Sequence, residues 1–163
     1  MPGIAAAHYW SVQRRAQASA APGAAAHGAW LCLATPLHYI AELSNVRLSP
    51  EGILSLDAAE AAQLVRDFNH TWRDSAFRLE ALGATLFCRA DQALDAAQCD
   101  PERALGRHIQ QFLPTGGQAG ALKRLMSEME MWLFEHEVNR VRASRMAPSI
   151  SGLWLWGGGP TLD

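Results

Sequence analysis

Three polar residues near the end of a long helical pattern have the types and spacing of an anion site. His136, Asn139 and Arg142 follow one another at steps of three in EHEVNRVR, and such steps keep side chains within about a 120° arc of a helix. An imidazole, a carboxamide and a guanidinium on one face could hold a small anion, with Arg142 as the forked donor. Alternatively, they could close the core, with Asn139 and Arg142 bonded to carbonyls of the following loop. The sequence leaves both interpretations open.

A second candidate lies close to the C-terminus, in SGLWLWGGGP. Trp154 and Trp156 stand directly before Gly157, Gly158 and Gly159. Consecutive glycines after a strand could let backbone N–H groups surround an anion, but no helix follows whose dipole would strengthen such a site. The glycines could instead serve close packing at the end of the chain.

Metal binding and nucleophilic catalysis have little support in the sequence. The six histidines are scattered and no H-E-x-x-H motif occurs. His136 and its neighbours Glu135 and Glu137 cannot all face one ion, because successive residues diverge on a helix. A G-x-S-x-G elbow is also absent. We therefore expect no catalytic residue, no metal and no cofactor.

Composition restricts the class of protein. A chain of 163 residues with a net charge of -2 suits one globular domain and does not favour nucleic-acid binding. The uncharged stretch 16–41 is interrupted by Pro22, Gly23 and Pro36, which argues against a membrane span. Three cysteines without a C-x-x-C pair fit reduced thiols. We expect a cytoplasmic protein with neither nucleic-acid nor membrane partners.

The elements that must position the candidate residues begin after a flexible, Ala-rich lead-in at 1–28, so that 29–163 is a single domain. Short strands are predicted at 29–34, 38–43, 45–49 and 52–56. Asp57 and Glu60 form a capping box that opens a helix over 58–73. A hairpin over 77–82 and 84–90 turns at Gly83.

The second half is predicted to be mainly helical. Asp100 and Pro101 open a short helix over 101–112, and Thr115 with Gln118 forms a capping box for a long helix over 118–143. A final strand covers 152–156. The buried stripe of the long helix contains Leu122, Met126, Met129 and Leu133, and it continues to His136. The predicted fold is α+β: an antiparallel or mixed sheet covered on one face by two main helices.

Several of these motifs together resemble a known family. LPTGGQ, LMSEMEMWLFEHEVNRVR and GLWLWGGG occur in the order found in the proteobacterial RpfE family of regulatory proteins, whose members are often labelled phosphoglycerate mutase-like. The tail also resembles the inserted domain of archaeal-type, cofactor-independent phosphoglycerate mutases. The matching residues are His136, Asn139, Arg142, Pro148, Trp154, Trp156 and Gly157. Glu137, Ser151 and Gly158 depart from the mutase pattern.

The resemblance implies an inserted domain without its catalytic partner. In those mutases two metal ions and a nucleophilic hydroxyl lie in a separate core, whose Asp and His clusters have no counterpart here, and two-metal phosphoryl transfer needs such ligands. We therefore expect a non-catalytic regulatory or interaction module, acting through a protein partner or a small ligand where the long helix ends beside the last strand. The alternative is an enzyme or sensor for a small phosphorylated or carboxylated metabolite. The candidate ligand-binding residues in both cases are His136, Asn139, Arg142, Trp154, Trp156, Gly157, Gly158 and Gly159.

Overall fold

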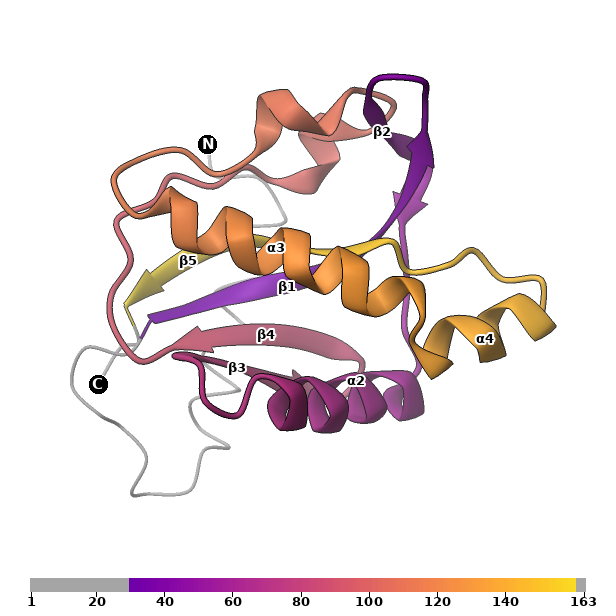
Figure 1. Cartoon of the computed structure of the whole chain (residues 1–163), viewed down its shortest axis with the longest axis horizontal. Coiled ribbons are helices and arrows are strands. Elements are labelled where there is room, and N and C mark those ends of the chain that lie inside the picture. Colours follow the sequence, from indigo (N-terminus) through magenta and orange to yellow (C-terminus); the bar gives the residue numbers. More distant parts are fainter. Residues whose placement is uncertain (1–29, 161–163) are drawn as a thin grey trace.

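An antiparallel sheet of five strands forms the centre of the computed structural model, which describes residues 30–160 (Figure 1). Four strands follow the order β2-β1-β4-β3, and β5 pairs with the other side of β1. Helices α2 and α3 cover one face of this sheet. The predicted α+β class is confirmed, and the sheet is antiparallel throughout. The predicted lead-in at 1–28 lies outside the described residues.

The central strand, β1 (Trp30–Ala41), is continuous where two strands were predicted. One side pairs with β5 (Gly152–Pro160). The other side pairs first with β4, up to Leu33, and then with β2 (Val46–Ile53) from Leu37 onwards. Pro36 stands between these two partners, so the strand accommodates a residue that cannot donate to a ladder. The strands predicted at 45–49 and 52–56 are likewise the single strand β2.

The hairpin of β3 (Phe77–Leu82) and β4 (Thr85–Ala90) confirms the prediction. Gly83 has a φ of 61°, a conformation that glycine adopts without steric cost. Leu86 and Cys88 belong to the main core beneath the helices, whereas Phe87 packs in a smaller cluster on the opposite face. The sheet therefore has apolar residues on both faces.

Helix α2 (Ala58–Thr71) has the predicted capping box at its start. The Asp57 carboxylate accepts from the Glu60 backbone N–H, and Glu60 accepts from that of Asp57. Ala61, Leu64 and Phe68 are buried against the sheet. This cap places Glu60 at 7% exposure at the end of the helix that faces the candidate site.

The long helix predicted over 118–143 is in fact two helices, α3 (Ala119–Phe134) and α4 (Glu137–Ser144). All four residues of the predicted buried stripe of α3 are in the core. The stripe does not continue to His136, because this residue has the extended φ and ψ of −71° and 143° and is the N-cap of α4. Its ring nitrogen Nδ1 accepts from the Val138 backbone N–H, which supports the start of the new helix.

The segment between β4 and α3 differs most from the prediction. Two 3₁₀ turns, Pro101–Ala104 and Ile109–Phe112, replace the helix predicted over 101–112, and Gly106 between them has a φ of 69°. Asp100 caps the first turn as predicted. The capping box of Thr115 and Gln118 is absent, since the Gln118 side chain accepts from the Asp95 backbone instead.

The last strand is longer than predicted, because β5 runs to Pro160 through all three glycines. Its side away from β1 contacts the segment before the first 3₁₀ turn, where Gly158 N–H donates to Gln98. Within residues 30–160, no helix combines the length and apolar character needed to cross a membrane.

Candidate functional site

His136 lies between α3 and α4 and is bonded on both ring nitrogens. Nδ1 accepts from Val138, and Nε2 lies 3.1 Å from the Asp67 carboxylate of α2. The ring packs edge-on against Trp132, with centroids 4.5 Å apart. Burial lowers the pKa of His136, while Asp67 acts in the opposite direction. The geometry fits a neutral ring that donates from Nε2 and accepts at Nδ1.

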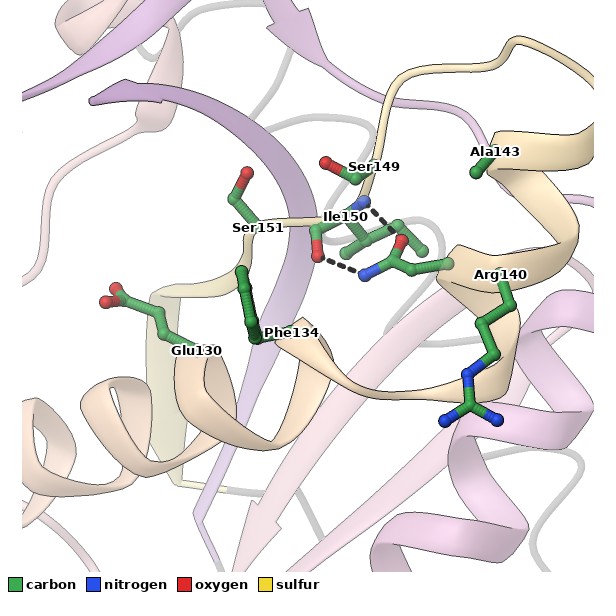
Figure 2. Close-up of a pocket in the computed structure, with 8 residues that line it drawn as sticks. Glu130, Phe134, Arg140, Ala143, Ser149, Ile150 and Ser151 are labelled. Carbon is green, nitrogen blue, oxygen red and sulfur yellow. Dashed lines mark hydrogen bonds between the residues drawn. The ribbon is translucent and has the colours of Figure 1, made fainter.

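Asn139 ties the two helices to the segment that leads into β5. Its amide nitrogen donates to the Leu133 carbonyl at 2.8 Å and to the Ile150 carbonyl at 2.9 Å. Its oxygen accepts from the Ile150 N–H at 2.7 Å. Figure 2 shows the two bonds to Ile150 as dashed lines. Both polar atoms of the carboxamide are thus bonded to backbone groups at the end of α3 and before β5.

Arg142 connects α4 to the start of α2. Its Nη1 donates to Glu60 at 2.9 Å, and its Nε donates to the Pro148 carbonyl at 2.6 Å. Arg145 also reaches Glu60, at 3.0 Å. Arg142 is only 6% exposed, so this ion pair is largely removed from water. An anionic ligand at Arg142 would have to compete with Glu60.

These three residues therefore belong to α4 and its N-cap but do not share a binding surface. His136 bonds to α2 through Asp67, Asn139 bonds to Ile150, and Arg142 bonds to Glu60 and Pro148. The contacts of Asn139 and Arg142 with loop carbonyls match the core-closing interpretation of the sequence. The structure brings the three together as the framework of the junction between α3, α4 and β5.

The tryptophans of β5 are also bonded inside the protein. Trp154 is 1% exposed and donates to the Cys99 carbonyl, while the half-buried Trp156 donates to the Thr35 hydroxyl. Each indole N–H thus has the partner that a buried donor requires. Figure 1 shows the whole strand beside β1, remote from α4 except at its first residues.

The three glycines have different environments. Gly157 has a φ of 66° and lies where the register between β1 and β5 shifts. A Cβ on Gly158 would lie 1.9 Å from the Trp30 indole, so this position admits no side chain. A Cβ on Gly159 would meet nothing within 4 Å. The close-packing alternative therefore accounts for Gly158, and the Gly158 N–H is already bonded to Gln98.

A pocket of about 370 Å³ lies beside this framework, where α3 ends and β5 begins (Figure 2). Its walls come from the last turns of α3, from α4 and from the segment before β5. The lining residues are Glu130, Phe134, Asn139, Arg140, Ala143, Ser149, Ile150 and Ser151. Of the eight residues predicted for the site, Asn139 lines this pocket. The predicted location, the junction of the long helix with the last strand, contains the pocket.

Sequence reasoning missed Glu130 and Phe134 as site residues. Phe134 lies outside the buried stripe of α3 and is 85% exposed, although it is a large aromatic residue. Glu130 is half-buried, and burial raises its pKa to about 7. Burial, and then the charge of Glu130, raises the pKa of the nearby Tyr39 phenol. An aromatic residue off the apolar stripe was the one available signal in the sequence.

No group of three His, Cys, Asp or Glu side chains that could hold a metal ion occurs in the described part of the chain. Cys32 and Cys88 face each other across β1 and β4 as buried free thiols. The pocket offers carboxylate, hydroxyl and guanidinium groups next to an aromatic ring, which is a set suited to binding polar ligands.

Comparison with known proteins gives a distant relationship. No protein-family model matches the chain, and no solved structure matches it. A 66-residue stretch is 38% identical to the 2,3-bisphosphoglycerate-independent phosphoglycerate mutase of Methanothrix thermoacetophila (strain DSM 6194 / JCM 14653 / NBRC 101360 / PT). This stretch covers 40% of the chain and 17% of that mutase. The chain is thus similar to a small part of the mutase, and the relationship is phosphoglycerate mutase-like at a distance.

Proposed function

We propose that this chain is a non-catalytic regulatory or interaction module that binds a protein partner or a small ligand at the pocket between α3, α4 and β5. One observation carries the proposal: of two residues that line this pocket, one is held by hydrogen bonds and the other is exposed to solvent. Asn139 is fully bonded to the backbone. Phe134, on the same pocket, is 85% exposed. Aromatic side chains, Phe included, are enriched at binding interfaces, and here one lies exposed beside a rigid framework.

In this proposal the predicted site residues act mainly by positioning. His136 and Arg142 fix α4 against α2, and Asn139 fixes the segment before β5. Trp154, Trp156 and the glycines from Gly157 to Gly159 fix β5 against β1. The regulatory role follows from the resemblance to RpfE-type proteins, and the cytoplasmic setting follows from the cysteine pattern; both belong to the same proposal.

A variant that fills the pocket tests this function without disturbing the core. Ala143 is exposed and lines the pocket, so Ala143→Phe places a bulky ring in the pocket; the exposed neighbour Ser144 does not line it. The tagged chain and both variants, Ala143→Phe and Ser144→Phe, are used to capture partners and small molecules from extracts of the native host. We expect the wild type and Ser144→Phe to retain the same protein or metabolite, and Ala143→Phe to lose it. Equal capture by all three, or no specific capture by any, contradicts the proposal.

The alternative proposal is an enzyme or sensor for a small phosphorylated or carboxylated metabolite, which is compatible with the distant match to the mutase. In this case the anion binds at Arg142 and displaces Glu60 from its guanidinium. Phosphoglycerate mutase activity of the purified chain, with divalent metal added and contaminating enzyme excluded, would establish the alternative and overturn the non-catalytic reading. A thermal shift with 3-phosphoglycerate that Arg142→Lys abolishes would establish the sensor.

A further inference from the structure

The Glu130 carboxylate is the polar group of the pocket that has no internal partner. It is half-buried, and no hydrogen bond or ion pair reaches it from residues 30–160. A half-buried carboxylate without a protein partner among these residues is open to the pocket and can accept hydrogen bonds from a ligand.

The stem of Glu130 lies close to the start of β5. A Cβ on Gly152 would lie 3.0 Å from the Tyr39 hydroxyl oxygen and 3.3 Å from Cγ of Glu130. The bare backbone of Gly152 therefore lets the side chains of α3 and β1 approach the strand together. The stem of Glu130 therefore lies against the start of β5, beside Tyr39.

An aromatic ring lies one helical turn beyond this carboxylate. Phe134 follows Glu130 by four residues, a spacing that puts both side chains on one face of α3, and both line the pocket. Figure 2 shows the Phe134 ring next to Ser151, with Glu130 on the preceding turn of α3. A carboxylate next to an exposed aromatic face is the pair of groups that binds organic cations, through an ion pair and a cation–π contact.

Hydroxyl oxygens of the segment before β5 provide further acceptors. The Ser151 hydroxyl accepts from the Tyr39 backbone N–H and has a second lone pair. The Ser149 hydroxyl lies 3.5 Å from Nδ1 of His38. An ammonium group has three donors and no acceptor, so a pocket with several acceptors matches its bonding needs.

The cation that lines the pocket does not compete for Glu130. Arg140 is bonded to Glu137 at 3.2 Å, one turn earlier in α4. Figure 2 shows its guanidinium directed away from Glu130 and Ser151. Since Glu137 is paired with Arg140, Glu130 and the exposed Glu135 are acidic groups near the end of α3 that have no ion pair within residues 30–160. Such unpaired acids favour a cationic ligand.

We propose that the pocket binds an ammonium group, held between the Glu130 carboxylate and the Phe134 ring with the Ser151 hydroxyl as a second acceptor. The inference rests on the proposed function, since it names the ligand chemistry of the same pocket. The ammonium group belongs either to a free small amine or to a lysine side chain of a partner protein. Both sources present the same ammonium group, but in a lysine side chain the group is attached to a polypeptide.

Binding of this kind depends on the ionised form of Glu130. Its pKa of about 7 means that the carboxylate is mostly ionised at pH 8 and mostly protonated at pH 6. The other titratable or charged groups around the pocket are Tyr39 and His38 from β1, and Arg140 from α4. Burial raises the pKa of Tyr39 further from this range, so the phenol stays neutral between pH 6 and 8.

The test is a titration of the full chain followed by backbone amide chemical shifts. The probes are n-butylamine, a capped lysine (N-acetyl-lysine N′-methylamide), and its uncharged norleucine analogue. We expect saturable shifts at residues 149–152 with the two amines at pH 8, and affinity at least about fivefold lower at pH 6. Tighter binding of the capped lysine points to a partner's side chain, and equal binding points to a free amine.

Variants separate this inference from the proposed function. Glu130→Gln should weaken amine binding about tenfold, the loss expected for one charge-assisted contact, and should remove the pH dependence. Glu135→Gln, an exposed acid that does not line the pocket, serves as control and should bind as the wild type does. Melting curves of both variants verify folding. If the norleucine analogue binds as well as the lysine, the ammonium inference fails while the pocket remains a binding site. If no probe shifts residues 149–152, the inference is overturned, and the capture experiment with Ala143→Phe decides the proposed function independently.

Discussion

The polar residues of α4 and the pocket beside them differ in how their bonding needs are met. His136, Asn139 and Arg142 bond to groups from α2, from the end of α3 and from the segment before β5. Glu130 and Phe134, one or two turns earlier in the chain, lie beside the same junction without such partners. The polar residues that match the mutase motif thus show where the helices and the last strand meet. The residues without internal partners show which surface is available for binding.

The largest effect on the hydrogen-bonded framework is expected when the Arg142 side chain is removed. Arg142→Ala leaves the buried Glu60 carboxylate with Arg145 alone and the Pro148 carbonyl without a donor. We expect a loss of about 3 kcal/mol in the free energy of unfolding, the lower end of the range for a broken buried pair, because Arg145 still offsets part of the charge. Urea unfolding measures it, with Arg145→Ala as the milder control. A loss below about 1 kcal/mol would mean that Arg142 is not part of the framework.

Two neighbouring glycines of β5 allow a matched test of close packing between β5 and β1. Gly158→Ala forces a Cβ against the Trp30 indole, whereas Gly159→Ala meets open space. Overpacking of this kind costs roughly 1–3 kcal/mol, so the melting temperature should fall for Gly158→Ala and stay nearly constant for Gly159→Ala. Equal effects of the two substitutions would refute the packing role of Gly158.

A smaller effect, of opposite sign, is expected at Glu130. Its folded-state pKa of about 7 lies above the usual value of 4.5, so the folded protein holds the proton more tightly than the unfolded chain. Stability is therefore lost as pH rises from 4.5 to 7, and the loss is complete above 7. Because the side chain is partly exposed, we discount the effect to about 1 kcal/mol.

Glu130→Gln removes this penalty. The variant should be more stable than the wild type at pH 8 and closer to it at pH 5, measured by urea unfolding at both values. Glu135→Gln, at an exposed position, should show no such difference between the two pH values. A Glu130→Gln chain less stable than the wild type at pH 8 would show that the carboxylate has an internal partner.

Local patterns predicted the parts of the fold that local chemistry decides. The capping box of Asp57 and Glu60, the turn at Gly83 and the buried stripe of α3 all follow from residues a few positions apart. The continuity of β1 through Pro36 depends on a change of neighbour from β4 to β2. This change of partner depends on tertiary contacts, which the periodicity of apolar residues along the sequence does not reveal.

The candidate site was predictable in place but not in detail. The sequence located the junction, yet it put His136 on a continuous helix, because helical spacing alone does not reveal that its side chain caps a new helix. The partners of Arg142 are likewise distant in sequence, as Glu60 is 82 residues away. Whether a polar residue is bonded or free depends on such distant contacts, so the pocket residues Glu130 and Phe134 emerged only in three dimensions.

The most direct test of the account measures the free energy of unfolding of two variants that line the same pocket, Asn139→Ala and Phe134→Ala. Asn139→Ala removes three hydrogen bonds to the backbone of Leu133 and Ile150, and we expect a loss of about 2–3 kcal/mol. Phe134→Ala truncates an exposed ring, and the loss should stay below about 0.5 kcal/mol. This result would establish Asn139 as framework and Phe134 as free surface. Similar losses for the two variants, or a larger loss for Phe134→Ala, would contradict the distinction on which the proposed binding site rests.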